Sequence, residues 1–162
     1  MLSTTSQSSP TEFQAVTDAL LTASRALVAV AARSLASIDA DVTLPQYRAL
    51  VVLASRGPRL VGQLADDLAV HASTATRLCD RLVAKKLVRR AVTRDNRRET
   101  AITLTAAGRQ IVDAVTAIRR SEIERIVGRI PAPLRDSTVV ALSAFSAAAG
   151  EPADHSWSLG WS

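Results

Sequence analysis

A stripe of apolar residues near the N-terminus constrains the fold more strongly than any other feature of this sequence. From Phe13 onward, apolar residues recur at alternating spacings of three and four, which places them along one line of a long helix. A line this narrow is typical of a helix that packs lengthwise against another helix. The residues of the stripe are Phe13, Val16, Leu20, Ala23, Leu27 and Val30.

Two more helices are predicted near the C-terminus. The first is expected to begin at Thr105, and Pro131 and Pro133 separate it from the last helix, which Gly150 and Pro152 end. The first and last stripes have no partner of sufficient size within one small domain, so we expect an obligate homodimer that covers them. The C-terminal stripes consist of Ile111, Val115, Ile118, Ile126 and Ile130, followed by Leu134, Thr138, Leu142, Phe145 and Ala149.

The middle of the chain predicts three shorter helices. Thr43 and Gln46 form a capping box and Pro45 lies in the first turn, so a helix is expected to run to about Ser55 and to end at Gly57-Pro58. The next elements are an extended segment at 59–61, a helix at about 62–68 with Leu64, Ala65 and Leu68 facing inward, and a helix from about His71 to Lys86.

The third of these helices has two different faces. Its inward face carries Ala75, Leu78, Cys79 and Leu82, whereas Ser73, Thr76, Arg77, Asp80 and Ala84 face outward and are free to touch a partner. After it, β-branched residues at 87–92 and 98–104 flank the polar link at 93–97, which predicts a hairpin with a cationic tip.

Positive charge is concentrated in this middle segment. Residues 43–105 contain twelve Lys and Arg and five Asp and Glu, a surplus of seven positive charges, while the whole chain has a net charge of +5. The rest of the chain therefore has a surplus of two negative charges. A basic module on a nearly neutral scaffold indicates binding to a polyanion.

Two short helices, a tight link, a third helix and a basic hairpin follow the order of a winged helix-turn-helix, in which the third helix enters the major groove of DNA. The set of segments resembles the MarR family, the multiple antibiotic resistance regulators of bacteria and archaea, over nearly the whole chain. The matching segments are Leu44-Pro45-Gln46-Tyr47-Arg48-Ala49-Leu50, Gln63-Leu64-Ala65, Thr76-Arg77-Leu78-Cys79-Asp80-Arg81-Leu82, and Arg97-Arg98 followed by Leu104-Thr105-Ala106-Ala107-Gly108.

The resemblance implies a dimer held by the first helix and the last two helices. It also implies binding to a palindromic operator, usually as a repressor, with release by a small aromatic or phenolic ligand. One residue departs from the family pattern: Asn96 occupies the place, two residues before Arg98, where the family usually has Asp. Asp95 could substitute for it, or the wing is held differently.

The expected DNA contacts lie on the third helix and on the wing. Arg77 is the residue expected to reach guanine, and a wing arginine can enter the adjacent minor groove. The alternative for the arginines is a solvated charged face, and Asp80 with Arg81 could instead form a structural pair. The candidate residues are Ser73, Thr74, Thr76, Arg77, Arg81, Arg94, Arg97 and Arg98.

These observations predict one mainly α domain of the α+β winged-helix type, at 12–150, between a mobile tail at 1–11 and a second tail at 151–162. The DNA-binding lobe is expected at about 43–105, with dimerisation helices at about 12–38 and 105–149. Trp157 and Trp161 lie in the second tail, and the sequence assigns them no role.

The sequence gives little support for an enzyme, a metalloprotein or a membrane protein. No nucleophile–base pair, carboxylate dyad or Gly-rich phosphate loop is found, so we expect no enzyme. With Cys79, His71 and His155 as the full Cys and His content, no metal or cofactor is expected, and a lone cysteine is consistent with the cytoplasm. The most apolar segment, at 20–32, is short and interrupted by Arg25, so no membrane span is expected.

Three alternatives remain open at this stage. Cys79 is either a core residue or an oxidant sensor, and its inward position favours the core. Tyr47 either packs in the core or lies near a ligand. As a whole, the chain is either a sequence-specific regulator or an architectural DNA-binding protein, and these differ by about a thousandfold or more in preference for an operator over bulk DNA.

Overall fold

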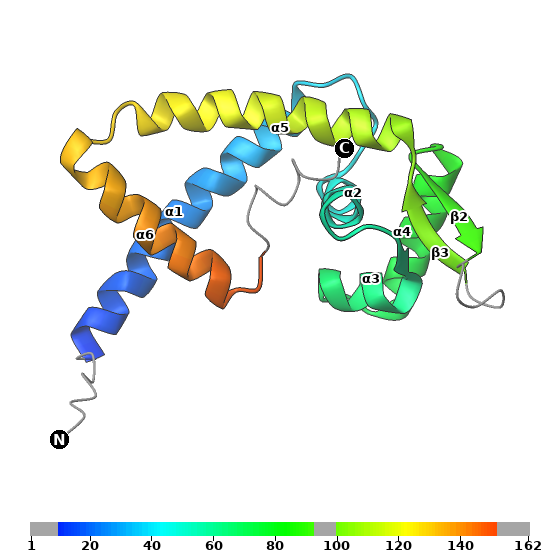
Figure 1. The fold of residues 1–162 in the computed structure, drawn as a ribbon, viewed down its shortest axis with the longest axis horizontal. Helices are drawn as coiled ribbons and strands as arrows, with labels where there is room; N and C mark the ends of the chain where they lie inside the picture. The colour runs from blue at the N-terminus through cyan, green and yellow to red at the C-terminus, as the bar shows by residue number, and fades with distance from the viewer. Residues whose placement is uncertain (1–9, 93–99, 152–162) are drawn as a thin grey trace.

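The computed structural model describes residues 10–92 and 100–151, and Figure 1 shows their arrangement. The described part is mainly helical with one small sheet, as the sequence predicts. Its elements are α1 (Pro10–Ala36), α2 (Leu44–Arg56), β1 (Arg59–Leu60), α3 (Val61–Leu68), α4 (Ala72–Ala84), β2 (Val88–Val92), β3 (Thr100–Leu104), α5 (Ala106–Val127) and α6 (Ala132–Ala148).

The long helix α5 connects two parts of the molecule (Figure 1). At its N-terminal end, α2, α3, α4 and the three strands form a compact unit, which we call the lobe. At its other end, α5 leads into α6, which runs back toward the lobe, and α1 extends from α5 toward the N-terminus; α1 and α6 with the C-terminal half of α5 are called the arm. Among the described residues, 44–92 and 100–104 thus make up the lobe.

The predicted capping box of α2 is confirmed. The Thr43 hydroxyl accepts a hydrogen bond from the Gln46 backbone N–H at 3.5 Å, and the Gln46 side-chain oxygen accepts from the Thr43 N–H at 3.1 Å. At the other end, Gly57 has a φ of 75°, a conformation that favours glycine and stops the helix. Both ends of α2 are therefore determined by local sequence.

Helix α4 begins after His71, as predicted, but ends at Ala84, two residues earlier than expected. The cause is Lys86, whose φ of 60° lies in the left-handed region and turns the chain toward β2. The sheet has the strand order β1-β3-β2, with both pairs antiparallel and Arg90 opposite Ile102 on β3. The predicted hairpin is thus present, and its link at 93–99 lies outside the described residues.

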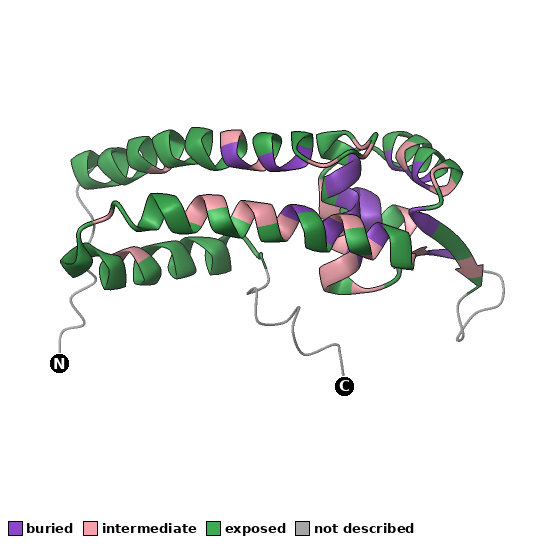
Figure 2. Ribbon diagram, turned by 90° about the horizontal axis from the view of Figure 1, so that it is seen from above, coloured by how far each residue is buried: buried purple, intermediate pink, exposed green. Residues whose placement is uncertain are grey.

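The hydrophobic core is inside the lobe and under the adjoining part of α5, where Figure 2 shows most of the buried residues. Side chains from α2, α3, α4, β3 and α5 meet there. Fully buried examples are Leu50, Leu64, Leu82, Ile102 and Val112.

The arm is much less covered than the lobe. Only Val30, Ser34 and Leu35 of α1 are buried, and α6 has no buried residue. By length and composition α1 could also cross a membrane, although a buried core helix of a soluble protein and a signal sequence pass the same test. The sequence-based expectation that no membrane-spanning segment is present considered only residues 20–32, whereas the apolar helix α1 runs from Pro10 to Ala36.

Gly108 lies where the start of α5 passes close to the backbone between α4 and β2. A Cβ atom there would lie 2.2 Å from the Leu87 carbonyl oxygen and 2.8 Å from Cδ1 of Leu104. The same Leu87 carbonyl accepts hydrogen bonds from the Thr105 N–H and hydroxyl, so it cannot move without breaking them. The start of α5 is therefore fixed against the strand that leads into the wing.

We predict that Gly108→Ala lowers the free energy of unfolding by about 1–3 kcal/mol, because the added methyl group clashes with backbone. Urea denaturation followed by circular dichroism at one protein concentration measures the change. Gly62→Ala is the matched control, since nothing lies within 4 Å of its added Cβ and alanine favours the helix by up to about 1 kcal/mol. Equal stability of the two variants would contradict the packing described here.

Candidate nucleic-acid interface

One face of α4 is open to solvent and the other is buried. Ala75, Cys79 and Leu82 have no exposed surface and fasten the helix to the core. The residues predicted to contact DNA from this helix are all exposed, and they are Ser73, Thr74, Thr76, Arg77 and Arg81. The predicted division of α4 into an inward and an outward face is confirmed.

The outward face offers both acceptors and cationic donors. The Thr76 hydroxyl donates its proton to the Ala72 carbonyl at 2.9 Å, so toward a partner it presents its oxygen lone pairs and its methyl group. Arg77 and Arg81 follow at one-turn spacing and add two guanidinium groups on the same side. Such a surface can accept from, donate to and pack against base edges.

The N-terminus of α4 is favourable to an anion. His71 is the N-cap residue, its side chain makes no capping hydrogen bond, and the first turn contains no acidic residue. The positive end of the helix dipole is therefore not compensated by a carboxylate in its own first turn. This end of α4 is suited to contact a phosphate, together with the outward side chains.

An ion pair connects α4 to the hairpin. The Asp80 carboxylate on α4 lies 2.5 Å from Nη2 of Arg90 on β2. The alternative in which Asp80 pairs with Arg81 is therefore wrong, and Arg81 points outward without an ion pair among the residues that the structure describes. The pair joins β2 to α4, and because both side chains are well exposed its own energetic contribution is small.

Several other basic side chains of the lobe hold elements together. Lys85 donates to the Asp41 backbone carbonyl, and its Nζ lies 3.0 Å from the Asp41 carboxylate and 3.3 Å from the side-chain oxygen of Gln46. Arg56 and Arg59 both contact the Asp67 carboxylate. Sequence reasoning missed these roles, because partners 8 to 44 residues apart meet only in the folded lobe.

The wing residues Arg94, Arg97 and Arg98, together with Asn96, lie outside the described residues. The strands that lead to them are described, and Arg89 and Arg90 on β2 are exposed. The hairpin therefore carries basic residues on the same lobe as the outward face of α4.

Cys79 and Tyr47 are both buried. Cys79 has no exposed surface, and burial raises the pKa of its thiol. Arg90 lowers this pKa and Asp80 raises it, each less strongly than burial does. A raised thiol pKa disfavours the thiolate that oxidants attack, which supports the core interpretation.

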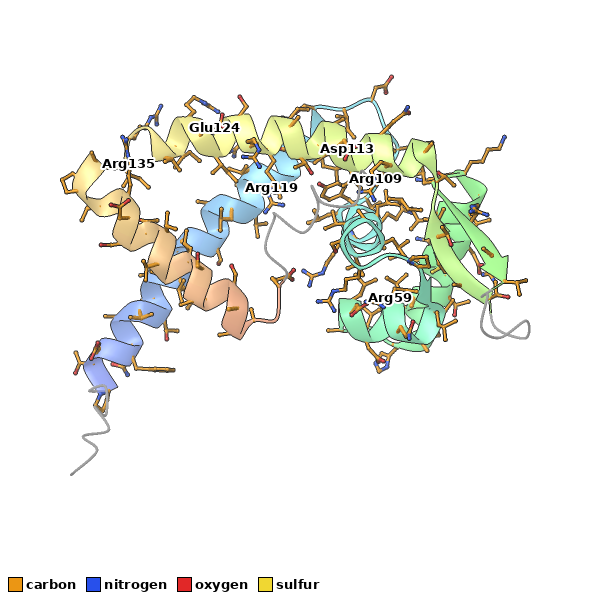
Figure 3. The ribbon with its side chains drawn as sticks, viewed as in Figure 1. Arg59, Arg109, Asp113, Arg119, Glu124 and Arg135 are labelled. Atoms are coloured by element: carbon orange, nitrogen blue, oxygen red, sulfur yellow. The ribbon has the colours of Figure 1, made fainter. Side chains whose placement is uncertain are left out.

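Tyr47 faces α5 and is 4% exposed. Burial raises the pKa of its hydroxyl, while the Thr116 side chain and the Arg119 guanidinium lower it less strongly. Figure 3 shows Arg109 and Asp113 on the stretch of α5 that passes over α2, and Arg109 donates to the Ala54 carbonyl at 3.3 Å. Packing therefore accounts for Tyr47.

A pocket of about 590 Å³ lies between α1 and α5, with both charged and apolar residues in its lining. Arg33 of α1 contacts the Glu122 carboxylate at 2.8 Å, and Arg125 contacts it at 3.5 Å. Ala117 and Ile118 add an apolar wall. Within residues 10–92 and 100–151, no group of three His, Cys, Asp or Glu is arranged to hold a metal ion.

Comparison with known proteins identifies the fold and the family. The family model described as MarR family matches residues 40–99, which cover most of the lobe. A crystal structure of RV1404 from Mycobacterium tuberculosis is 44% identical, with 92% of this chain and 99% of that chain aligned at a TM-score of 0.82. A MarR family protein from Bacillus stearothermophilus is 20% identical over 90% of this chain and 100% of that chain, with a TM-score of 0.79.

A curated relative gives a shorter match. It is the uncharacterized HTH-type transcriptional regulator YpoP of Bacillus subtilis (strain 168), 31% identical over 75 residues. The match spans 46% of this chain and 53% of that protein, so about half of its length is covered. With the winged lobe, the outward face of α4 and the near full-length similarity to a solved structure, the chain belongs to the MarR family of transcriptional regulators.

Proposed function

We propose that this chain is a sequence-specific DNA-binding repressor that recognises a palindromic operator as a homodimer and is released by a small ligand. The observation that carries the proposal is the outward face of α4, where small polar residues and two arginines are exposed on a helix seated by its opposite face. Such a helix fits the major groove, where each base pair presents a different pattern of donors and acceptors. The chain would act in the cytoplasm and without catalysis.

In this proposal the first two turns of α4 read base edges. Arg77 would donate two parallel hydrogen bonds to O6 and N7 of a guanine, a contact that suits its planar guanidinium. Ser73, Thr74 and Thr76 would contact neighbouring bases or phosphates, and Arg81, one turn further on, would contact the backbone.

The wing would contact the DNA beside the major groove site. Arg94, Arg97 and Arg98 are proposed to approach the minor groove, where narrow A·T-rich stretches attract a guanidinium. Because minor-groove edges are similar among sequences, these contacts would add affinity with little sequence information. The ion pair between Asp80 and Arg90 is consistent with this arrangement, since it joins β2 of the hairpin to α4.

The exposed apolar faces of the arm support a homodimer. Phe13 and Val16 of α1 are 71% and 55% exposed, and Val140 and Phe145 of α6 are 70% and 51% exposed. Phe13, Val16, Leu20 and Phe145 also line an apolar groove of about 430 Å³ between the two helices. A second copy would cover these faces and present two α4 helices to two half-sites.

The pocket between α1 and α5 is the candidate site for the proposed small aromatic acid. Arg33 and Arg125 could bind a carboxylate or phenolate, and Ala117 and Ile118 could pack against its ring. The Glu122 carboxylate already forms ion pairs with both arginines. An acidic ligand would therefore have to displace Glu122, which would change the contact between α1 and α5.

We predict that Arg77→Ala weakens operator binding by about 1–3 kcal/mol and removes the preference for one base pair in each half-site. Fluorescence anisotropy with an operator and its single-base variants measures both effects. Arg120→Ala is the matched control, because it removes the same charge from an exposed position of α5. Unchanged affinity and preference in Arg77→Ala would place another residue at the base edges. Binding of bulk DNA as tightly as the operator would instead indicate an architectural protein.

The wing arginines are expected to behave differently from Arg77. Arg97→Ala and Arg98→Ala should each weaken binding by about 1–3 kcal/mol for all sequences alike, and each should lower the salt-dependence slope by roughly one. Anisotropy titrations at several salt concentrations test this, with a thermal melt to show that the fold is intact. If neither variant changes affinity, the wing does not touch DNA.

The dimer is tested at the apolar groove of the arm. Phe145→Asp and Val16→Asp should each raise the dimer dissociation constant about a hundredfold, roughly 3 kcal/mol, because a carboxylate would be buried without a partner. Sedimentation velocity measures the shift to monomer. Val70→Asp, at an exposed apolar position of the lobe, is the control that should stay dimeric. A folded wild-type monomer at micromolar concentration would refute the proposal.

A further inference from the structure

Arg56, the last residue of α2, joins two parts of the chain that are far apart in sequence. Its Nη1 lies 2.6 Å from Oδ1 of Asp67 on α3, and its Nη2 donates to the Gly150 carbonyl oxygen at 3.2 Å. One guanidinium therefore connects the helix-turn-helix of the lobe to the end of α6 in the arm. The planar fork of arginine is suited to hold two acceptors in a fixed geometry.

The Asp67 side of this bridge is firmly held. The Asp67 side chain is only 14% exposed, and its second oxygen, Oδ2, accepts from Nε of Arg59 at 3.1 Å. Figure 3 shows Arg59 at the side of the lobe where α3 lies. Both carboxylate oxygens are thus occupied by guanidinium groups, and charge-assisted bonds of this kind are short and strong. Through Asp67, the Arg56 guanidinium is therefore joined to α3.

The α6 side depends on a glycine turn. Gly150 has a φ of 71°, and the N–H groups of Gly150 and Glu151 donate back to the carbonyls of Ala147 and Ser146 at 3.1 and 3.0 Å. This pattern is a Schellman motif, in which the left-handed residue is usually glycine. The turn leaves the Gly150 carbonyl available to accept from Arg56.

A second contact supports the same juxtaposition. Arg48 lies eight residues before Arg56, on the same face of α2, and its Nη2 is 3.9 Å from the Glu151 carboxylate. Both side chains are well exposed, so this ion pair contributes little energy by itself. It shows, however, that the end of α6 faces this side of α2 at two positions.

We propose that Arg56 is a positioning residue that sets the angle between the arm and the lobe, and thereby the separation of the two α4 helices in the homodimer. This inference rests on the proposed function. In a dimer held by its arms, a rotation of each lobe moves the two α4 helices relative to each other. Each base pair inserted between half-sites changes their separation by about 3.4 Å and their rotation by about 35°. A fixed angle therefore selects one half-site spacing.

The first test measures the spacing preference directly. Operators with the half-sites moved apart or together by one and two base pairs are titrated with wild type, Arg56→Ala and Arg56→Lys. Wild type should bind the operator with one spacing about tenfold or more tightly than the others. This is the size of effect that a single mismatched base pair has on operator binding. Both variants should show a preference of less than about threefold, while their affinity for a single half-site stays unchanged. Alanine donates to neither acceptor, and the single nitrogen of lysine cannot take both Nη positions from which Arg56 reaches Asp67 and Gly150.

Arg56→Lys is included to separate loss of the bridge from misfolding, because its ammonium group can still pair with Asp67 and keep α2 joined to α3. Arg59→Ala is the matched control: it also loses a bond to Asp67 but does not touch Gly150, so it should keep the spacing preference. If Arg56→Ala and Arg56→Lys retain the wild-type preference, the inference is overturned while DNA binding stands. If wild type prefers no operator at all, the proposed function fails instead.

The second test does not depend on DNA. Spin labels are placed in a Cys79→Ala background at two exposed positions, Asp66→Cys on α3 and Asp136→Cys on α6, and the distances between them are measured by pulsed electron resonance. Arg56→Ala should broaden the distance distribution within one chain, and labelled chains diluted with unlabelled ones isolate that distance. A distribution as narrow as that of wild type would overturn the positioning role whatever the DNA results.

Discussion

The burial of the inner face of α4 is the interaction on which the rest of the structure depends. Ala75, Cys79 and Leu82 are fully covered, and two of these three side chains are small, so the helix lies close to its neighbours. A helix fixed in this way cannot rotate without exposing apolar surface, at a cost of about 25 cal/mol for each Å². The orientation of Arg77 and the other outward residues is therefore determined by the core beneath them.

Among the described residues, some basic side chains of the lobe are paired with carboxylates, and others are left without such a partner. Asp41, Asp67 and Asp80 each bind a basic side chain from another element, which fixes Lys85, Arg56, Arg59 and Arg90 in place. In the described part of the chain, Arg77 and Arg81 have no carboxylate partner of this kind. The net positive charge that remains is thus concentrated on α4 and on the basic hairpin, where it can attract a polyanion.

Local signals explain which features could be predicted from the sequence. The capping box at Thr43 and Gln46 and the alternating faces of α4 depend on residues within one or two turns, so the sequence is sufficient to predict them. The pairs Asp80–Arg90 and Arg56–Gly150 join different elements, and no spacing rule indicates them. The early end of α4 at Ala84 also escaped prediction, because a lysine at positive φ has no sequence signature.

Helix α5 links recognition to the arm because its two ends make different contacts. Near its start, Gly108 is packed against Leu87 beside the hairpin, and further along, Glu122 pairs with Arg33 of α1. These points lie on one helix of 22 residues, about 33 Å long, which transmits a displacement with little bending. Helix α5 thus joins the contact with α1 to the base of the wing, and the bridge from Arg56 to Gly150 gives the C-terminal end of α6 a second connection to the lobe. Two connections restrict rotation of the arm against the lobe more than one would, so the orientation of the outward face of α4 depends on contacts at both places.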